Sequence, residues 1–241
     1  MFNNYLNASV TALFLIVASC ARVCIQLLAG RHDDHPLPGM TPLPHPLKVG
    51  AVLFPGFELL DIYGPLEMLG LLGNRIAISM LAVQPGEIPS SAGPKGVAEL
   101  SLATIRDFDL LLIPGGIGTR SLVTDPDFLD LLRTSATRAR IVACICTGSA
   151  LLAKIGLLDG HRATSNKIAF DWVTAQGPKV QWIREARWVQ DGRFWTSSGI
   201  SAGIDMTLGL IGHLYGRETS LDVARRAEYL WNENSSEDPF A

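Results

Sequence analysis

Ile-Val-Ala-Cys-Ile-Cys-Thr-Gly-Ser, residues 141–149, is the stretch that decides the fold. Its apolar first part predicts a buried strand, and a helix is predicted to begin at Thr147 with no spacer. A strand that passes directly into a helix forms a sharp elbow, and the central residue takes a strained backbone conformation. Such a turn closes only if the residues two before and two after its centre are small. Cys144 and Gly148 meet this requirement around Cys146, so we predict that Cys146 occupies the elbow.

Cys146 is the candidate nucleophile. The start of a helix carries about half a positive charge and unpaired backbone N–H groups. We therefore expect the thiol pKa to fall below its free value of about 8.5, so that thiolate is available. The alternative is a buried structural cysteine.

Strand and helix patterns alternate on both sides of this elbow. Strands are predicted at 48–54, 76–83, 109–113 and 140–145, with a hairpin of 188–190 and 194–197 around Asp191-Gly192. Helices are predicted at 60–72, 147–155, 202–215 and 220–230, and one more begins at Pro126 after an Asp125 cap. This alternation predicts an α/β domain with a doubly wound, mostly parallel, flavodoxin-like sheet and helices on both faces.

Asp61 lies in a second segment, residues 54–65, which is predicted to leave the sheet at the same edge as the elbow at Cys146. Ligands of such sheets bind at the carboxyl ends of the strands. Near a thiolate and among apolar neighbours the carboxyl pKa should rise, which would leave Asp61 protonated and able to donate a proton. The alternative is an aspartate that only caps a helix. Glu58 is a competing acid, which we expect to be more exposed.

Gly115 and Gly116 follow the buried strand 109–113. Glycines let backbone N–H groups approach a ligand closely. Together with the N–H of Thr147 they are predicted to form an oxyanion hole and to bind substrate. The loop does not have the pattern of a phosphate or dinucleotide loop.

Composition excludes several classes of partner. The net charge is −3 and no basic patch with interleaved aromatic residues occurs, so we expect no nucleic acid. The histidines are scattered and show no metal-ligand spacing, so no metal is expected. The four cysteines do not form a secreted disulfide framework. Free thiols suit a reducing compartment, and a cytoplasmic catalytic domain is predicted.

The first thirty residues are mostly apolar, and residues 31–46 form a proline-rich linker. Residues 1–30 have three interpretations: a membrane anchor, an extension outside the mature fold, or a cleaved signal peptide. The folded domain is predicted to cover 47–230, followed by a polar tail, 231–241.

These segments carry a resemblance to a known family. The order Pro55-Gly56 with Asp61 and Gly64-Pro65, then Asp109–Gly116, then Ile145–Ser149, then Gly199–Asp205 resembles the ThiJ/PfpI superfamily, whose fold is like that of class I glutamine amidotransferases. Within it, the chain is similar to the isonitrile (isocyanide) hydratase branch, whose members convert an isonitrile to an N-substituted formamide. The resemblance implies Cys146, Asp61 and Thr147 as functional residues, a homodimer, and no cofactor.

Two positions depart from related patterns. Protease-like and glyoxalase-like relatives often carry histidine where this chain has Thr147, and hydratase relatives often have histidine near the place of Asn166. Both departures weaken a Cys-His-Asp triad. Two alternatives stay open: another cysteine enzyme of the superfamily (glyoxalase, deglycase or amidase) and a non-catalytic thiol redox sensor. Related domains also form the sensor half of AraC-like regulators, which the short tail after Leu230 disfavours.

Overall fold

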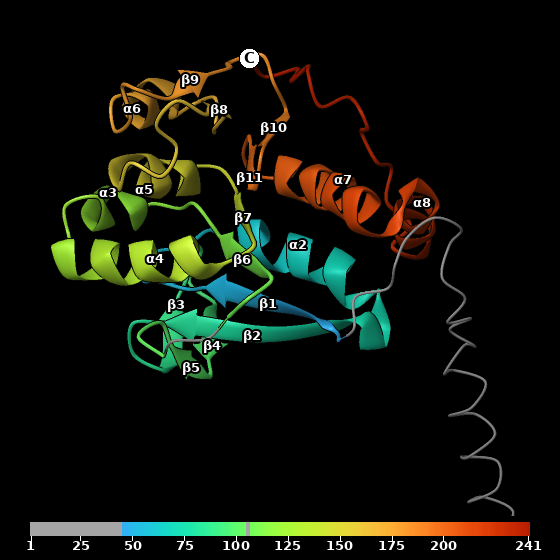
Figure 1. The fold of residues 1–241 in the computed structure, drawn as a ribbon, viewed down its shortest axis with the longest axis horizontal. Coiled ribbons are helices and arrows are strands. Elements are labelled where there is room, and N and C mark those ends of the chain that lie inside the picture. The colour runs from blue at the N-terminus through green and yellow to red at the C-terminus, as the bar shows by residue number, and fades with distance from the viewer. Residues whose placement is uncertain (1–44, 105–106) are drawn as a thin grey trace, which may run out of the picture. The chain divides into compact units, whose positions relative to one another are not determined.

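A computed structural model describes residues 45–104 and 107–241, which form the domain in Figure 1. A seven-stranded sheet is its centre. In spatial order the strands are β10 (Trp188–Asp191), β11 (Phe194–Ser197), β7 (Ile141–Cys144), β6 (Leu110–Ile113), β1 (Leu47–Val52), β2 (Ile76–Ala82) and β5 (Leu100–Ser101). All neighbours are parallel except β10 and β11, which form the predicted antiparallel hairpin.

Helices cover both faces of this sheet (Figure 1). One layer contains α2 (Leu59–Gly70), α7 (Ala202–Tyr215) and α8 (Arg217–Arg226), and the other contains α3 (Thr119–Leu122), α4 (Pro126–Arg138) and α5 (Gly148–Lys154). Asp125 caps α4 as predicted, because its carboxylate accepts a hydrogen bond of 3.1 Å from the Phe128 N–H. The predicted doubly wound α/β fold is therefore confirmed.

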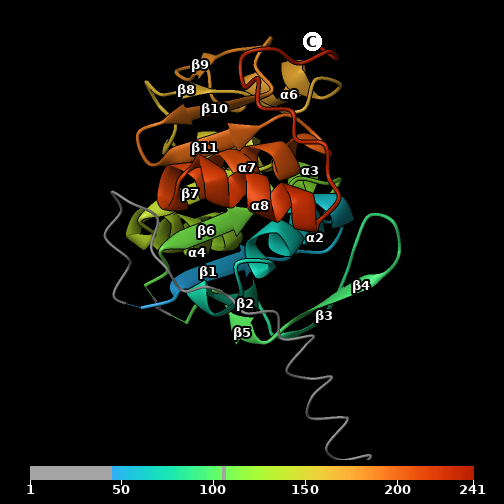
Figure 2. The same ribbon diagram turned by 90° about the vertical axis from the view of Figure 1, so that its right-hand side faces the viewer.

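Several short elements were not expected from the sequence. The hairpin of β3 (Gly86–Pro89) and β4 (Lys95–Ala98) extends beside the main sheet (Figure 2). A small parallel pair, β8 (Arg162–Ala163) and β9 (Gln181–Trp182), and the short helix α6 (Phe170–Thr174) lie near β10 (Figure 2). A 3₁₀ turn spans Gly73–Arg75. These pieces are too short to show a hydrophobic period in the sequence.

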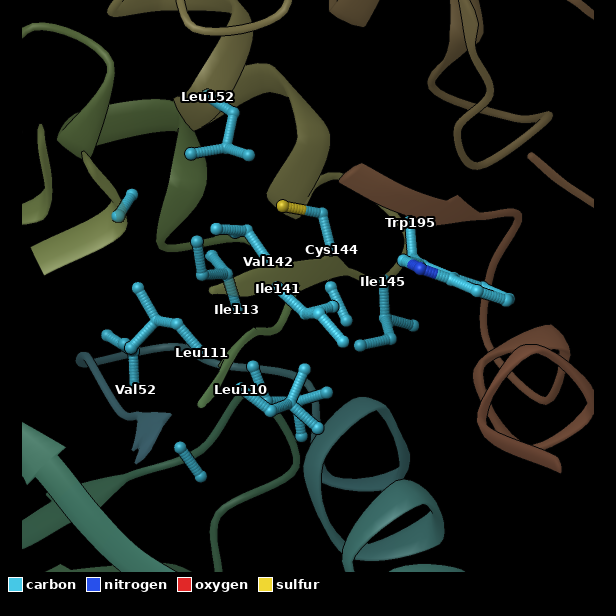
Figure 3. Packing of buried hydrophobic residues seen from close by; sticks show 14 of the residues in the cluster. Val52, Leu110, Leu111, Ile113, Ile141, Val142, Cys144, Ile145, Leu152 and Trp195 are labelled. Atoms are coloured by element: carbon cyan, nitrogen blue, oxygen red, sulfur yellow. The ribbon is translucent and has the colours of Figure 1, made fainter. Parts of the chain in front are cut away.

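The hydrophobic core is centred on β6 and β7, which are buried at every position. Strands covered by helices on both faces are expected to be apolar throughout rather than alternating. Figure 3 shows Val142 and Cys144 on one face of β7, toward Leu152 of α5, with Ile145 on the other face. Cys144 is therefore part of the core packing and has no exposed surface.

The chain reverses its direction of winding between β1 and β6. From β1 it runs outward through β2 to β5, and from β6 it runs the other way through β7 to β11. Connections that leave two neighbouring strands in opposite directions open a crevice at their carboxyl ends, which is where ligands bind in such sheets. The segments that follow β1, β6 and β7 carry Asp61, Gly115 and Cys146 respectively, so the topology brings the predicted residues to one place.

The predicted membrane anchor is not supported. Within residues 45–104 and 107–241 no helix is both long enough and apolar enough to cross a bilayer. The apolar segment itself, residues 1–30, lies outside the described residues, as do linker residues 31–44. Membrane association and the localisation derived from it are therefore withdrawn.

The C-terminal segment, residues 231–241, packs on the domain more closely than a polar tail would. The backbone N–H of Arg187 donates to the Ser235 carbonyl at 2.8 Å. Asp238 is buried with its carboxylate 3.9 Å from both Arg187 and Lys167. Arg187 in turn forms a buried ion pair with Asp205, whose second oxygen accepts from the Asn232 N–H at 2.9 Å.

Replacing Asp205 with alanine should destabilise the domain strongly. The change leaves the Arg187 guanidinium buried without its main partner, which costs about 3–5 kcal/mol. Urea denaturation of the two proteins measures the difference. Asp222→Ala is the matched control, because it removes an exposed i,i+3 ion pair with Arg225 and should change stability very little. Equal, small losses in both variants would show that the buried pair does not stabilise the fold.

Candidate active site

Cys146 occupies the predicted elbow between β7 and α5. Its φ angle is +55°, in the left-handed region that non-glycine residues rarely adopt. Hydrogen bonds hold this conformation: the Cys146 N–H donates to the Ser197 carbonyl at 3.2 Å, and the Cys146 carbonyl accepts from Ser165 Oγ at 2.8 Å. A Cβ atom at Gly148 would lie 2.6 Å from the Ile113 carbonyl oxygen, so the requirement for a small residue there is confirmed.

Asp61 lies in the first turn of α2 with no exposed surface. Its Oδ2 accepts a hydrogen bond of 2.8 Å from the Gly115 N–H. Its Oδ1 is buried and has no hydrogen-bond partner among the residues that the structure describes. The N-cap position belongs to Glu58, so the interpretation of Asp61 as a helix cap is wrong. Asp61 is instead a fully buried carboxyl group beside the Cys146 thiol.

Glu58 is more exposed than Asp61, as expected. Its Oε2 accepts a hydrogen bond of 2.8 Å from Ser91 Oγ. Its backbone N–H donates to the Gly115 carbonyl at 2.9 Å, which ties the start of α2 to the loop after β6. This bond and the one from Gly115 to Asp61 fix the carboxyl group relative to that loop.

The thiol of Cys146 and the carboxyl of Asp61 perturb each other. Burial raises the pKa of Asp61 well above its usual range, and the nearby Glu58 charge raises it further. Burial also raises the pKa of the Cys146 thiol, as does the Asp61 charge, whereas hydrogen bonds from Thr147 lower it. The expected rise for Asp61 is therefore present.

The expected lowering of the Cys146 pKa was wrong. The side chain is only 6% exposed and sits beside an acid, and these two effects outweigh the hydrogen bonds at the start of the short helix α5. Burial therefore favours the protonated form of both neighbouring groups. Because they interact, they titrate as a pair.

Thr147 is held by the loop after β6. Its Oγ1 accepts a hydrogen bond of 3.0 Å from the Gly116 N–H and lies 3.1 Å from Thr119 Oγ1. Thr119 is fully buried and could not be predicted from the sequence, because no motif marks this threonine at the start of α3. The Gly115 and Gly116 N–H groups thus bind Asp61 and Thr147, rather than standing ready for an oxyanion as predicted.

The structure therefore brings together Cys146, Thr147, Asp61, Gly115 and Gly116. Within the described ranges no three His, Cys, Asp or Glu side chains gather so that they could hold a metal ion. The arrangement consists of a thiol, a carboxyl group with a raised pKa and a hydroxyl at the carboxyl edge of a parallel sheet. It can add a thiol to an electrophile and move protons between neighbouring atoms.

A family model described as the DJ-1/PfpI family matches residues 47–213, which include the elbow, Asp61 and the glycine loop. The chain belongs to the DJ-1/PfpI family. The resemblance to this superfamily seen in the sequence is thereby confirmed.

Relatives within this family have different activities. The chain is 33% identical over 183 residues to an isonitrile hydratase of Pseudomonas putida, covering 76% of this chain and 78% of that protein. It is 31% identical over 186 residues to protein DJ-1 homolog A of Arabidopsis thaliana, covering 72% of this chain and 45% of that protein. It is 28% identical to the HTH-type transcriptional regulator GbdR of Pseudomonas aeruginosa, covering 80% of this chain and 53% of the regulator. The chain spans about half the length of each of these last two proteins.

A solved structure supports the same fold. A ThiJ/PfpI family protein from Pseudomonas syringae superposes with a TM-score of 0.72 at 28% identity, covering 83% of this chain and 84% of that one. The family and the fold are therefore established, whereas the reaction must be argued from the site.

Proposed function

We propose that this protein is a cysteine-dependent isonitrile hydratase that converts R–N≡C to an N-substituted formamide. The observation that carries the proposal is the buried Asp61 carboxyl group, with one oxygen uncommitted, next to the Cys146 thiol. An isonitrile requires this pairing, because its terminal carbon must receive both a proton and a nucleophile. The relative from Pseudomonas putida supports the same assignment.

In the first step the Cys146 sulfur attacks the isonitrile carbon while Asp61 delivers its proton to that carbon. The thiol proton passes to the Asp61 carboxylate, so the acid is restored as the S–C bond forms. The product of this step is a thioimidate, R–N=CH–S–Cys146. No free thiolate is needed, which agrees with the raised pKa values of both groups.

In the second step water attacks the thioimidate carbon. Asp61 protonates the nitrogen and takes a proton from the water, which gives a tetrahedral R–NH–CH(OH)–S–Cys146 intermediate. Collapse breaks the C–S bond, and the hydroxyl proton returns through Asp61 to the sulfur. The net reaction adds one water to the isonitrile. A direct attack of water assisted by Asp61, without the covalent step, uses the same residues.

The rim of the site favours an apolar R group. Ile200 is 43% exposed and follows Gly199, which lies against the Cys146 sulfur. Ile117 is 68% exposed and follows Gly116, which binds Thr147. An isonitrile with an alkyl or aryl substituent can cover these side chains when it enters.

The decisive experiment incubates the purified protein with an alkyl and an aryl isonitrile and follows formamide by mass spectrometry. Formamide that accumulates beyond the amount of protein supports the proposal. Parallel assays with methylglyoxal and with amide substrates test the other cysteine enzymes. Turnover of one of those substrates without formamide formation would replace the proposal, and mild peroxide that oxidises Cys146 in a protein without turnover would favour a redox sensor.

We further infer from the family resemblance that the chain is a homodimer. Light scattering on a size-exclusion column measures this directly: twice the chain mass of 26.0 kDa is expected, and the mass of one chain would refute the inference.

A further inference from the structure

Two of the three backbone donors predicted for an oxyanion hole are already in use. The Gly115 N–H donates to Asp61, and the Gly116 N–H donates to Thr147. The tetrahedral intermediate of the proposed reaction carries an oxygen on the carbon bound to Cys146, and a hydrogen-bond donor would stabilise the charge that develops on this oxygen as the intermediate collapses. The third donor, the Thr147 N–H, hydrogen-bonds the Cys146 sulfur itself, so a donor aimed at the oxygen can come from another part of the site.

Asn166 is placed to supply it. A Cβ atom at Gly199 would lie 2.4 Å from Asn166 Nδ2 and 2.7 Å from Cys146 Sγ. The amide nitrogen and the sulfur therefore both pack against Gly199, and only a residue without a side chain leaves room for the two of them side by side.

The orientation of the amide is fixed by its other end. Asn166 Oδ1 accepts a hydrogen bond of 2.9 Å from the Ala169 N–H. A backbone N–H can only donate, so the oxygen must face Ala169 and the NH₂ group must face the thiol. The NH₂ group therefore points toward the Cys146 sulfur, and the bond to Ala169 prevents the amide from turning over.

The segment that carries Asn166 is anchored on both sides of it. Ser165 Oγ donates to the Cys146 carbonyl at 2.8 Å. Lys167 Nζ donates to the Ala186 carbonyl at 2.7 Å and to Thr164 Oγ1 at 2.9 Å. A donor held in this way needs little reorganisation when charge develops on a bound oxygen.

We propose that the Asn166 side-chain amide donates a hydrogen bond to the oxygen of the tetrahedral intermediate formed at the carbon bound to Cys146. The amide donates without giving up its proton, so the atoms and charges of the hydration steps are unchanged. The inference rests on the proposed hydratase function. It gives this chain a neutral donor near the place where related hydratases often have histidine.

Two variants separate the donor from the structural role of Asn166. Asn166→Asp keeps the shape and the oxygen that accepts from Ala169, but it has no N–H. Asn166→Ser also keeps an acceptor for Ala169, but its side chain is too short to reach the place of the amide nitrogen beside the sulfur, and it adds no charge. In both, kcat and kcat/KM for the isonitrile should fall together by about 10²–10³-fold, the usual effect of losing one such donor. Asn234→Ser, which removes an exposed amide, is the control and should be unaffected.

Unfolding midpoints of all three variants should stay near that of the unmodified protein. Unchanged turnover in Asn166→Asp and Asn166→Ser would overturn the inference. A loss of turnover that is matched by a loss of folding stability would also overturn it, because the residue would then act only as a cap.

A second measurement does not depend on isonitrile turnover. The rate of Cys146 alkylation by iodoacetamide is followed by mass spectrometry against pH, with the fully buried Cys144 as internal reference. The charged groups that act on this thiol are Asp61 and Glu58, and Asn166→Asp adds a third carboxylate. We expect the alkylation midpoint to move to higher pH in Asn166→Asp, and by less in Asn166→Ser.

The two experiments distinguish the two proposals. A shifted midpoint in a protein that does not hydrate isonitriles would remove the proposed function and the oxygen-binding role, while showing that the amide lies at the thiol. No shift in either variant would show that the amide does not reach the sulfur, and this would overturn the inference even if the protein hydrates isonitriles.

Discussion

Cys146→Ser should abolish isonitrile turnover. Oxygen is far less nucleophilic than sulfur when both are protonated, and the acid pair at this site supplies no strong base to activate a hydroxyl. The serine fits the elbow, because its side chain has nearly the same size and the +55° φ angle is imposed by the backbone hydrogen bonds of residue 146. Formamide production by the purified variant measures the effect, and circular dichroism verifies that the domain is folded.

Cys144→Ser is the matched control for this substitution. Cys144 is fully buried in the core on β7, where burial raises its pKa strongly, so its thiol does not ionise near neutral pH (Figure 3). We expect most of the turnover to remain, with some loss of stability from burying a hydroxyl. Cys144→Ala avoids that cost if the serine variant folds poorly. Equal loss of turnover in the Cys144 and Cys146 variants, with both folded, would refute Cys146 as the nucleophile.

Asp61→Asn should slow the chemical step by about 10²–10⁴-fold, the typical effect of losing a general acid–base group. The amide oxygen can still accept the Gly115 N–H, so the shape of the site is kept and isonitrile binding should survive. What is lost is the transferable proton on the oxygen that has no other partner among the described residues. Single-turnover kinetics separate binding from the chemical step. Turnover close to that of the unmodified protein would exclude the acid role and direct attention to Glu58.

The pH dependence of stability gives an independent readout of the same group. Because the pKa of Asp61 is raised on folding, the folded state retains a proton that the unfolded state releases. The contribution of Asp61 to stability is therefore fully present below the unfolded pKa of about 3.9 and is lost as pH rises through the folded value. Asp61→Asn has no such loss, so it should become more stable relative to the unmodified protein across that window. Urea denaturation at several pH values measures the difference, and a constant difference would contradict the raised pKa.

Much of the fold could be predicted because its central strands are long apolar runs next to strong turn signals. The strand 109–113 ends in Pro114 and two glycines, and Asp191-Gly192 marks the hairpin, so both were located to within a residue or two. The short pairs β3–β4 and β8–β9 were missed, because four or fewer residues show no reliable period. The packing of residues 231–241 was missed because their composition is polar, whereas their anchoring depends on single buried contacts such as Asp238.

The residues that form the site could be predicted from the sequence, whereas the pKa shift of Cys146 could not. Strand-to-helix elbows and carboxyl ends of strands are visible in the sequence, so Cys146 and Asp61 could be placed at one edge. The sign of the Cys146 pKa shift was not visible, because it depends on how completely the folded chain removes the thiol from water. The engagement of the Gly115 and Gly116 N–H groups depends on Asp61 and Thr147 side chains from two other segments.

The position of Arg187 has a consequence for how the domain is completed during synthesis. Its backbone carbonyl accepts from the Ser198 N–H at 2.8 Å, and Ser198 in turn accepts from the Cys146 N–H at 3.3 Å. Its backbone N–H and its guanidinium are held by Ser235 and Asp205, and Asp205 itself binds the N–H of Asn232. A growing chain that has emerged only as far as α8 therefore contains Cys146 but lacks Asn232 and Ser235, which bind Asp205 and Arg187. We expect Cys146 to react faster with small alkylating reagents in a chain that ends at α8 than in the same chain with residues 232–238 docked.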